Sequence, residues 1–129
     1  MNDTRDDFTI GIEEEYLLID PESRDFVANP TEQVLKDCEA AIDPNIGGVS
    51  PEFLRAQVEV GTTVCRSISE ARTHLRTLRK TVAGVAEEHG MKIIAASTHP
   101  FANWSRQRPR TRTDTTSSPR ICRPSHTVC

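Results

Sequence analysis

Residues 67–89 carry the hydrophobic pattern that most restricts how this chain can fold. Ser67 followed by Glu70 is typical of a capping box at a helix start, and Gly90 is a typical stop after a helix end. Apolar side chains recur between them at helical spacing: Ile68, Ala71, Leu75, Leu78, Val82 and Val85. The pattern predicts an amphipathic helix of about six turns. Its apolar stripe has to be buried, and we expect it to lie on a sheet.

Three other segments have the patterns of strands. Phe8–Ile19 alternates between apolar and polar side chains, and it is followed by turn residues at 20–23. Leu54–Val60 is a second predicted strand, and Lys92–Ser97 is a short apolar third one. Together with the long helix, these segments predict a chain that mixes helices and strands.

A shorter helix is predicted between the first two strands. It begins near Pro30, with Asn29 or Thr31 as its N-cap. Its apolar face consists of Val34, Leu35, Cys38 and Ile42. Residues 43–48 contain a proline and two glycines, so we expect a loop there.

Length and composition exclude several classes of protein. A chain of 129 residues favours one domain, which buries roughly two thirds of its unfolded surface. No apolar run approaches the roughly 18 residues of a membrane-spanning helix, and residues 1–7 are too acidic for a signal peptide, so we expect a cytoplasmic protein. The cysteines show no metal-ligand spacing and are expected to be free thiols: Cys38, Cys65, Cys122 and Cys129.

The last 25 residues differ in composition from the rest of the chain. Residues 105–129 contain six arginines and one acidic residue, whereas residues 1–104 contain eighteen acidic and ten basic residues. Ile121 and Val128 are the only aliphatic residues of the tail. We therefore divide the chain into a folded part, residues 1–104, and a disordered basic tail, residues 105–129.

This tail has the composition that an out-of-frame reading of GC-rich DNA tends to give. Codons can be chosen for Thr113–Cys129 that, read from the third base of the first codon, encode RYHQLAEDMQAVAHRL. That string has apolar residues at helical spacing, and the frameshift hypothesis fails if the gene lacks those codons. The alternative is a native basic arm that binds nucleic acid or another polyanion.

The candidate chemistry begins with three consecutive glutamates in the first strand. Glu13 and Glu15 point to one face of a strand, and Glu14 points to the other. Two carboxylates on one face repel each other unless a cation lies between them, and Mg²⁺ prefers oxygen ligands of this kind. The alternative is a solvated sheet face on which the acidic side chains bind nothing.

The second strand repeats this acidic pattern. Gln57 and Glu59 share one face, and Thr62 follows directly after the strand. If the two strands pair with their polar faces together, Glu13, Glu15 and Glu59 converge on one cation site. His99, before Pro100, is a further candidate for substrate contact, although a lone histidine beside a turn is more often structural. No histidine is placed near Cys65 in the sequence, so we interpret this thiol as part of the core.

Three linked motifs resemble a known family. They are FTIGIEEEYLLID, PEFLRAQVEVGTTVCRSISEARTHLRTLR and AASTHPFANW, and the similarity covers residues 8–104 nearly continuously. The chain resembles the N-terminal part of the type 2 glutamate-cysteine ligase family, the ATP-dependent carboxylate-amine ligases of bacteria. Family members are considerably longer, and this chain lacks their later strands.

The resemblance implies an α+β fold similar to glutamine synthetase, in which an antiparallel sheet backed by helices lines the active site. It implies ATP and Mg²⁺ as cofactors, with Glu13, Glu15 and Glu59 at metal-ligand positions. Glutamate is then activated as an acyl phosphate, and cysteine or another amine attacks it. Substrate contacts are assigned to Gln57, Thr62 and His99.

We expect this truncated chain to be inactive by itself. Neither nucleic acid nor a membrane is expected as a partner, and an oligomer is compatible with the sequence. The alternative from another functional class is a non-catalytic α/β binding module whose basic tail binds polyanions, with an affinity that falls as salt rises.

Overall fold

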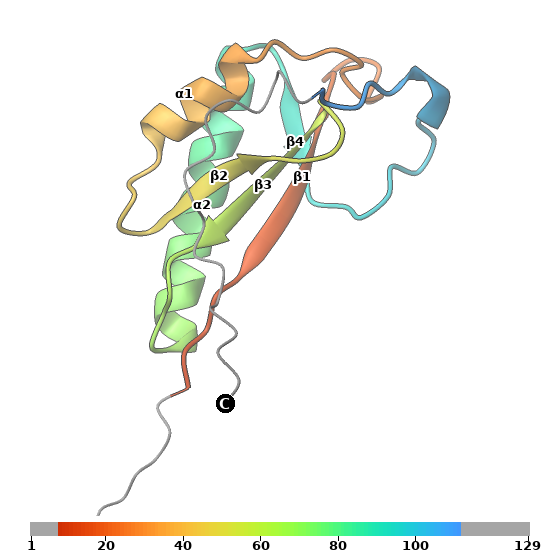
Figure 1. Ribbon diagram of the computed structural model, residues 1–129. Coiled ribbons are helices and arrows are strands. Elements are labelled where there is room, and N and C mark those ends of the chain that lie inside the picture. The colour runs from red at the N-terminus through yellow and green to blue at the C-terminus, as the bar shows by residue number, and fades with distance from the viewer. Residues whose placement is uncertain (1–7, 112–129) are drawn as a thin grey trace, which may run out of the picture.

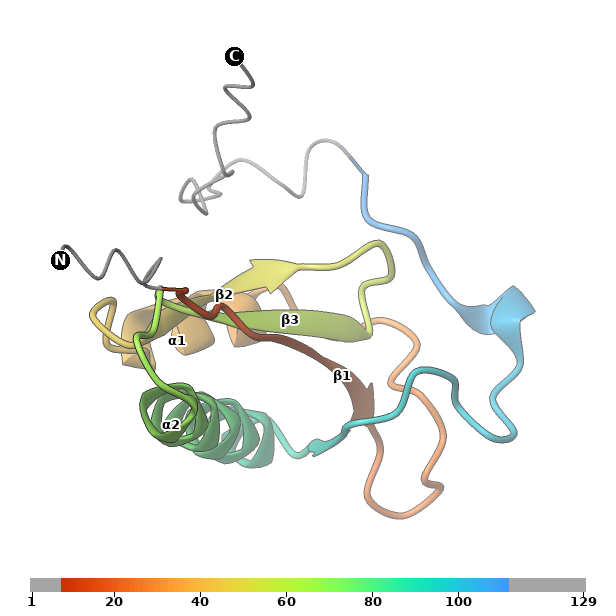
Figure 2. The ribbon, with the colours of Figure 1, turned by 90° about the horizontal axis from the view of Figure 1, so that it is seen from below.

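The computed structural model describes residues 8–111 and shows one sheet with two helices packed against it (Figures 1 and 2). The elements, in chain order, are β1 (Glu13–Ile19), α1 (Gln33–Ala41), β2 (Gly47–Pro51), β3 (Gln57–Thr62), α2 (Ile68–Glu88), β4 (Lys92–Ile94) and the 3-10 helix η1 (Trp104–Arg106). Every strand pair is antiparallel. The predicted α+β class, an antiparallel sheet backed by helices, is confirmed.

The strand order is β2-β3-β1-β4, so β1 and β3 are the central strands. Glu15 of β1 lies opposite Glu59 of β3, and Glu13 lies opposite Gly61. On the other side of β3, Ser50 of β2 also lies opposite Glu59. Directly opposite residues point to the same face of a sheet, so Ser50, Glu59 and Glu15 form one row across three strands.

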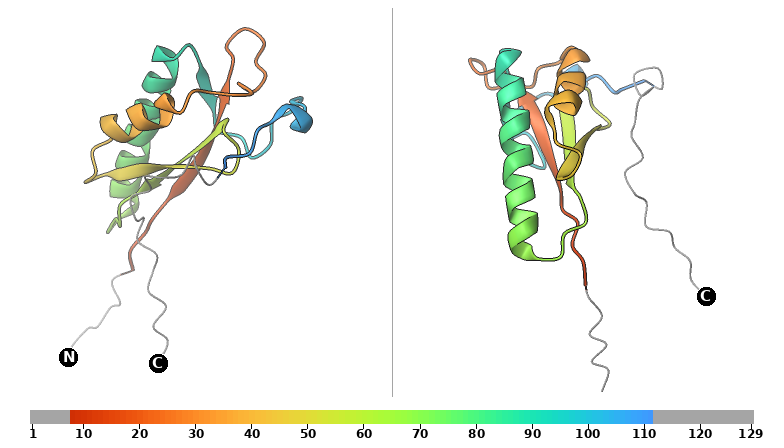
Figure 3. Two further views of the ribbon diagram at one scale, coloured as in Figure 1. Left: turned by 45° about the horizontal axis from the view of Figure 1, so that its top comes forward. Right: turned by 90° about the vertical axis from the view of Figure 1, so that its left-hand side faces the viewer.

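The opposite face of the sheet carries the hydrophobic core. Tyr16 and Leu18 of β1 and Val58 and Val60 of β3 are at most 1% exposed. They pack against residues of both helices: Val34, Leu35, Cys38, Leu78, Val82, Val85 and Ala86. Each fully buried aliphatic or aromatic side chain contributes about 1.5–3 kcal/mol, so this face supplies most of the stability. Figure 3 shows α2 running along the sheet, with α1 packed beside it.

Helix α2 begins as the sequence predicts. The Ser67 hydroxyl accepts a hydrogen bond from the Glu70 backbone N–H at 3.1 Å. The Glu70 carboxylate accepts one from the Arg66 backbone N–H at 2.7 Å, one residue before the position expected for a capping box. Gly90 follows the helix with φ of +71°, a conformation that glycine adopts at no steric cost.

Of the two N-caps predicted for α1, Thr31 lies one residue before the observed N-cap and accepts a hydrogen bond from the Gln33 backbone N–H at 3.3 Å. Glu32 occupies the N-cap position and its side chain makes no capping hydrogen bond. The Asn29 side-chain oxygen Oδ1 instead accepts a hydrogen bond from Arg55 Nη1 at 3.0 Å, which links this turn to the connection between β2 and β3. The predicted apolar face of α1 is confirmed as buried.

Strand boundaries were predicted less well than helices. β2 was missed, because Gly47 and Gly48 were assigned to a loop although they pair with β3. The second predicted strand begins at Gln57 rather than Leu54, and the third ends at Ile94 rather than Ser97. Pairing partners from distant parts of the chain decide where a strand starts and ends, and a local pattern does not contain them.

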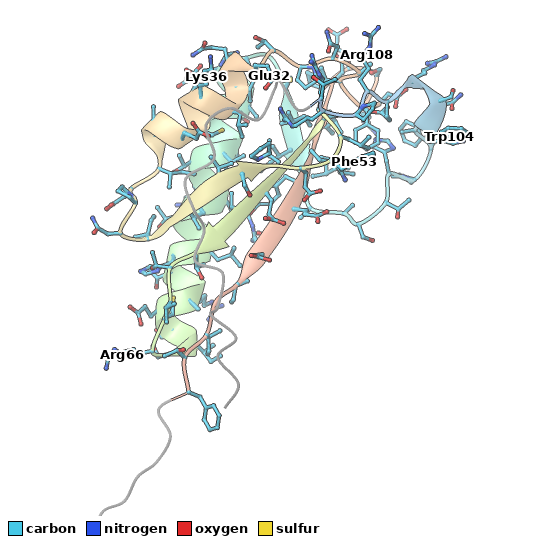
Figure 4. The ribbon with its side chains drawn as sticks, in the orientation of Figure 1. Glu32, Lys36, Phe53, Arg66, Trp104 and Arg108 are labelled. Atoms are coloured by element: carbon cyan, nitrogen blue, oxygen red, sulfur yellow. The ribbon has the colours of Figure 1, made fainter. Side chains whose placement is uncertain are left out.

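The structure describes only the first residues of the predicted tail. Over residues 105–111 the backbone is hydrogen-bonded rather than disordered: Arg110 donates its backbone N–H to Phe53, and Pro109 forms a bridge with Leu54. The Arg110 side chain is 7% exposed and pairs with Glu32 at 2.8 Å. Figure 4 shows Trp104 and Arg108 on the outside of this segment. Residues 112–129 lie outside the described part, so the frameshift hypothesis stays a prediction.

Two further expectations concern the described residues. Within residues 8–111, no helix combines the length and the apolar character that crossing a membrane requires. Cys38 and Cys65 are free and buried, as predicted. Cys122 and Cys129 lie outside the described residues.

Candidate metal site

The three consecutive glutamates of β1 occupy two different environments. Glu14 points to the helix-covered face, where Arg79 of α2 binds its carboxylate through Nη2 at 2.7 Å and Nε at 3.1 Å. The Tyr16 hydroxyl donates to the same carboxylate. Burial alone would raise the pKa of Glu14, but the hydrogen bonds from Arg79 and Tyr16 outweigh it, and the pKa is lowered. Glu14 is therefore a paired, ionised and partly buried residue.

Glu13 and Glu15 lie on the uncovered face. No ion pair to either side chain occurs within residues 8–111, in contrast to Glu14. The register places Glu15 directly across from Glu59, and the Ser50 hydroxyl donates to Glu59 at 3.1 Å. Like charges directly opposite each other destabilise a sheet, and a cation between the two carboxylates would remove this cost.

The structure brings three carboxylates together, and this cluster, called the carboxylate group below, differs by one residue from the predicted set. Oxygen atoms of Glu15, Glu52 and Glu59 lie within 4.8 Å of one another. Glu13 lies on the same face but outside this group. Glu52 was missed, because it follows β2, a strand that the sequence pattern did not reveal. The only local signal was that Glu52 lies two residues after Ser50, the spacing at which side chains of a strand point to the same face.

The electrostatics of Glu59 reflect this crowding. Burial raises its pKa, the hydrogen bond from Ser50 lowers it, and the charges of Glu13, Glu52 and Glu15 raise it again, so that the net pKa is raised. A carboxylate with these neighbours is more costly to ionise than an isolated one. A bound divalent cation would reverse this cost for the whole group.

The donor set fits a hard divalent cation. Mg²⁺ takes oxygen ligands at about 2.1 Å and commonly uses one or two carboxylates, with water and phosphate oxygens completing the shell. Ligand oxygens around such an ion are about 3–4 Å apart, and the carboxylate oxygens of Glu15, Glu52 and Glu59 lie within 4.8 Å of one another. Among the described residues no ion pair to the side chains of Glu15, Glu52 or Glu59 is formed, although the Arg110 guanidinium donates to the Glu52 backbone carbonyl at 3.1 Å.

The predicted substrate residues are placed in three different surroundings. Gln57 is half-buried on β3, two residues from Glu59 and on the same face. Thr62 is on the opposite face at the end of β3, and its hydroxyl accepts a hydrogen bond from the Ile12 backbone N–H at 3.0 Å. His99 lies away from the carboxylate group, so their assignment to substrate stays a prediction.

His99 has a structural setting in this fold. It is 8% exposed and stacks between Phe26 and Phe101 at ring-centroid distances of 4.8 and 4.7 Å. One ring nitrogen contacts the Arg24 carbonyl at 2.9 Å, and the other accepts from the Ala102 backbone N–H at 3.1 Å. The two ring nitrogens thus hold together the loop that follows β1 and the loop that follows β4.

Cys65 has a histidine neighbour that the sequence did not indicate. His74 lies two turns into α2, and its Nδ1 is 3.5 Å from the Cys65 sulfur and 3.3 Å from the Thr63 hydroxyl. Cys65 is fully buried and donates to the Thr63 carbonyl at 3.2 Å. The pair therefore anchors the turn between β3 and α2, which agrees with the predicted core role of the thiol.

The comparison with known proteins identifies the family. Residues 9–117 match the family described as glutamate-cysteine ligase family 2 (GCS2). The chain belongs to glutamate-cysteine ligase family 2. A family member from Rhodospirillum rubrum, provisionally named glutamate–cysteine ligase 2, is 54% identical over 99 residues, which are 76% of this chain and 25% of the relative.

Other members of glutamate-cysteine ligase family 2 match with similar coverage. Relatives with the same provisional name come from a Jannaschia species, 51% identical over 78% of this chain and 25% of the relative, and from Chloroflexus aurantiacus, 44% identical over 82% and 26%. The chain thus spans about a quarter of the length of these relatives. Among solved structures, the alpha subunit of aIF2 from Pyrococcus abyssi gives a TM-score of 0.48 at 13% identity. The match covers 75% of this chain and 38% of that chain, and we draw no conclusion from a similarity this low.

Proposed function

We propose that this chain supplies the metal-binding strands of an ATP-dependent carboxylate-amine ligase that joins the γ-carboxylate of glutamate to the amino group of cysteine. The observation that carries the proposal is the Glu15–Glu59 pair, completed by Glu52 within 4.8 Å, in a chain that belongs to the ligase family. A sheet has no structural need for like charges facing each other at its centre. A cation explains them.

In this proposal Glu15, Glu52 and Glu59 hold Mg²⁺. The ion supplies charge neutralisation for the phosphates of ATP during phosphoryl transfer to the glutamate carboxylate. Ser50 orients the Glu59 carboxylate by its hydrogen bond. Glu14, fixed by Arg79 and Tyr16 on the other face, holds β1 against α2 and so positions the neighbouring Glu15.

We further propose that residues 1–129 do not turn over substrates by themselves. The relatives extend over about four times the matched length, and a site that binds ATP, glutamate and an amine requires more lining residues than this sheet offers. A chimera tests the point: residues 8–111 replace the matching part of the Rhodospirillum rubrum relative, and Mg²⁺-dependent ADP release is measured with glutamate and cysteine. Turnover by the 129-residue chain alone would contradict this part of the proposal.

Binding of Mn²⁺, as a spectroscopic substitute for Mg²⁺, tests the metal site in the chain itself. We expect electron paramagnetic resonance to detect one bound Mn²⁺ ion, which Mg²⁺ displaces. Glu15→Gln or Glu59→Gln should each weaken Mn²⁺ affinity about tenfold or more, since each removes one charged ligand. Glu22→Gln, in the exposed turn after β1, is the matched control. Equal Mn²⁺ affinity in all variants would refute the proposed site.

A further inference from the structure

The sheet does not fix the three residues of the carboxylate group equally. Glu15 and Glu59 lie on the central strands β1 and β3, where the strand register sets their positions. Glu52 follows the last residue of β2, Pro51, and lies in the connection to β3, residues 52–56. Its carboxylate accepts a hydrogen bond from the adjacent Phe53 backbone N–H at 2.9 Å, which is a local contact. The place of Glu52 therefore depends on what holds this connection.

Arg110 contacts the connection at three of its residues. The guanidinium Nε donates to the Glu52 backbone carbonyl at 3.1 Å, and Nη2 donates to the Arg55 carbonyl at 3.3 Å. The Arg110 backbone N–H donates to the Phe53 carbonyl at 2.8 Å. A planar guanidinium directs its N–H groups in fixed directions, so these bonds allow the connection little freedom.

The charge of Arg110 has its partner on the other side of the guanidinium. Nη1 donates to the carboxylate of Glu32, the N-cap residue of α1, at 2.8 Å. The Arg110 side chain is 7% exposed, and each of its three nitrogens has an acceptor. Buried charged groups that lose their acceptors are costly, so the arrangement favours one geometry. Figure 4 shows Glu32 and Phe53 at the same end of the molecule, where this link joins α1 to the connection.

We propose that Arg110 is a positioning residue, which holds Glu52 where its carboxylate meets those of Glu15 and Glu59. It acts through the backbone carbonyl of Glu52 and is not itself a metal ligand. Its role in metal binding rests on the proposed function, whereas its effect on the place of Glu52 does not. Arg110 precedes Thr113, the residue at which the frameshift hypothesis begins.

Hydrogen exchange of the metal-free chain tests the positioning itself. Arg110→Lys keeps the positive charge but has no planar group that reaches both backbone carbonyls. The Phe53 N–H is bonded to the Glu52 carboxylate and the Arg55 N–H to the Arg108 carbonyl. Both amides should exchange at least about fivefold faster in the variant, with exchange in the β1–β3 pair unchanged. Equal rates at Phe53 and Arg55 in both chains would overturn the inference.

Mn²⁺ affinity, measured by electron paramagnetic resonance, tests the route through Glu52. Arg110→Lys should weaken binding about tenfold, the lower end for loss of a residue that supports a metal ligand. It should have no further effect in a Glu52→Gln background, because the ligand that it positions is already lost, and its full effect in a Glu59→Gln background. Arg108→Lys, at an exposed position of the same segment, is the matched control and should change neither exchange nor affinity.

The outcomes separate this inference from the proposed function. Mn²⁺ binding that depends on Glu15 and Glu59 but not on Arg110 would overturn the inference alone. An equal loss in the Glu52→Gln and Glu59→Gln backgrounds would do the same, since it would show a general effect on the fold. Absence of Mn²⁺ binding in the unaltered chain would refute the proposed metal site, and hydrogen exchange would still decide whether Arg110 fixes Glu52.

Discussion

The two faces of the sheet treat the same residue type in opposite ways. On the helix-covered face, Glu14 is bound by Arg79 and Tyr16 at the edge of the core. On the uncovered face, Glu15 stands opposite Glu59, and within residues 8–111 no ion pair to either side chain is formed. On the covered face the charge of Glu14 has a partner in Arg79, whereas on the uncovered face three carboxylates lie together in the arrangement that we propose binds a cation.

The contrast shows how a protein can separate stability from function across the thickness of one strand. Residues of the covered face lower the free energy of the folded state through burial. The crowded carboxylates of the uncovered face raise it, since like charges are held together, and a cation bound there would offset this cost. Substitutions on the two faces should therefore have effects of opposite sign.

The largest effect is expected at the core of the covered face. Leu78 of α2 is fully buried against β1 and β3, so Leu78→Ala should lower the free energy of unfolding by about 2–5 kcal/mol. Urea denaturation followed by circular dichroism measures the loss. Leu75→Ala, at a partly buried position of the same helix, should cost less. Equal losses at both positions would mean that the helix packs differently.

Adjacent glycines of β2 compare the faces directly. A Cβ atom on Gly47 would lie 2.2 Å from the Gly61 carbonyl oxygen and 2.8 Å from a Leu78 methyl group, whereas one on Gly48 would meet nothing within 4 Å. Gly47→Ala should destabilise the chain by about 1–3 kcal/mol through overpacking. Gly48→Ala should change stability by less than about 0.5 kcal/mol. Thermal unfolding of the two variants measures the difference. A lower melting temperature for Gly48→Ala than for Gly47→Ala would contradict the assigned faces.

Arg79→Ala should lower the free energy of unfolding by about 1 kcal/mol. This is at the low end for a hydrogen bond to a charged group, because Arg79 is 52% exposed. The pKa of Glu14 is lowered in the folded state, so its contribution is full above the ordinary glutamate value of 4.5 and is lost as pH falls through the folded pKa. The difference between wild type and Arg79→Ala should therefore shrink in acid. Arg76→Ala, on the exposed face of α2, is the control and should show no such pH dependence.

The smallest effect, and the opposite sign, is expected on the uncovered face. Glu15→Gln should stabilise the metal-free chain by about 0.5 kcal/mol at neutral pH, because it removes one of three crowded charges. The pKa of Glu59 is raised, so ionising it costs stability above that pKa, and the advantage of Glu15→Gln should vanish as pH falls and Glu59 is protonated. The free energy of unfolding of both chains is measured with a chelator and with added Mg²⁺. Added Mg²⁺ should stabilise the wild type more than Glu15→Gln. Destabilisation without metal would show that Glu15 has a structural partner.

Local patterns were enough to predict α2, its cap and the buried face of α1, because helix periodicity and capping depend on residues three or four apart. Strand alternation was likewise enough to place Glu14 opposite to Glu13 and Glu15. The bounds of β3 and the existence of β2 were not predicted. Gly47 and Gly48 form a strand only because β3 supplies hydrogen-bond partners and the helices leave no room for side chains at Gly47.

The candidate site divides in the same way. The sequence by itself determined which acidic residues could share a face, because that depends on a two-residue period along one strand. Only the tertiary structure decided that Glu15 rather than Glu13 meets Glu59, that Glu52 joins them, and that His74 reaches Cys65. Register across strands is set by packing of the whole core against α1 and α2, and a shift of β1 by one residue would have turned Glu15 to the other face, away from Glu59.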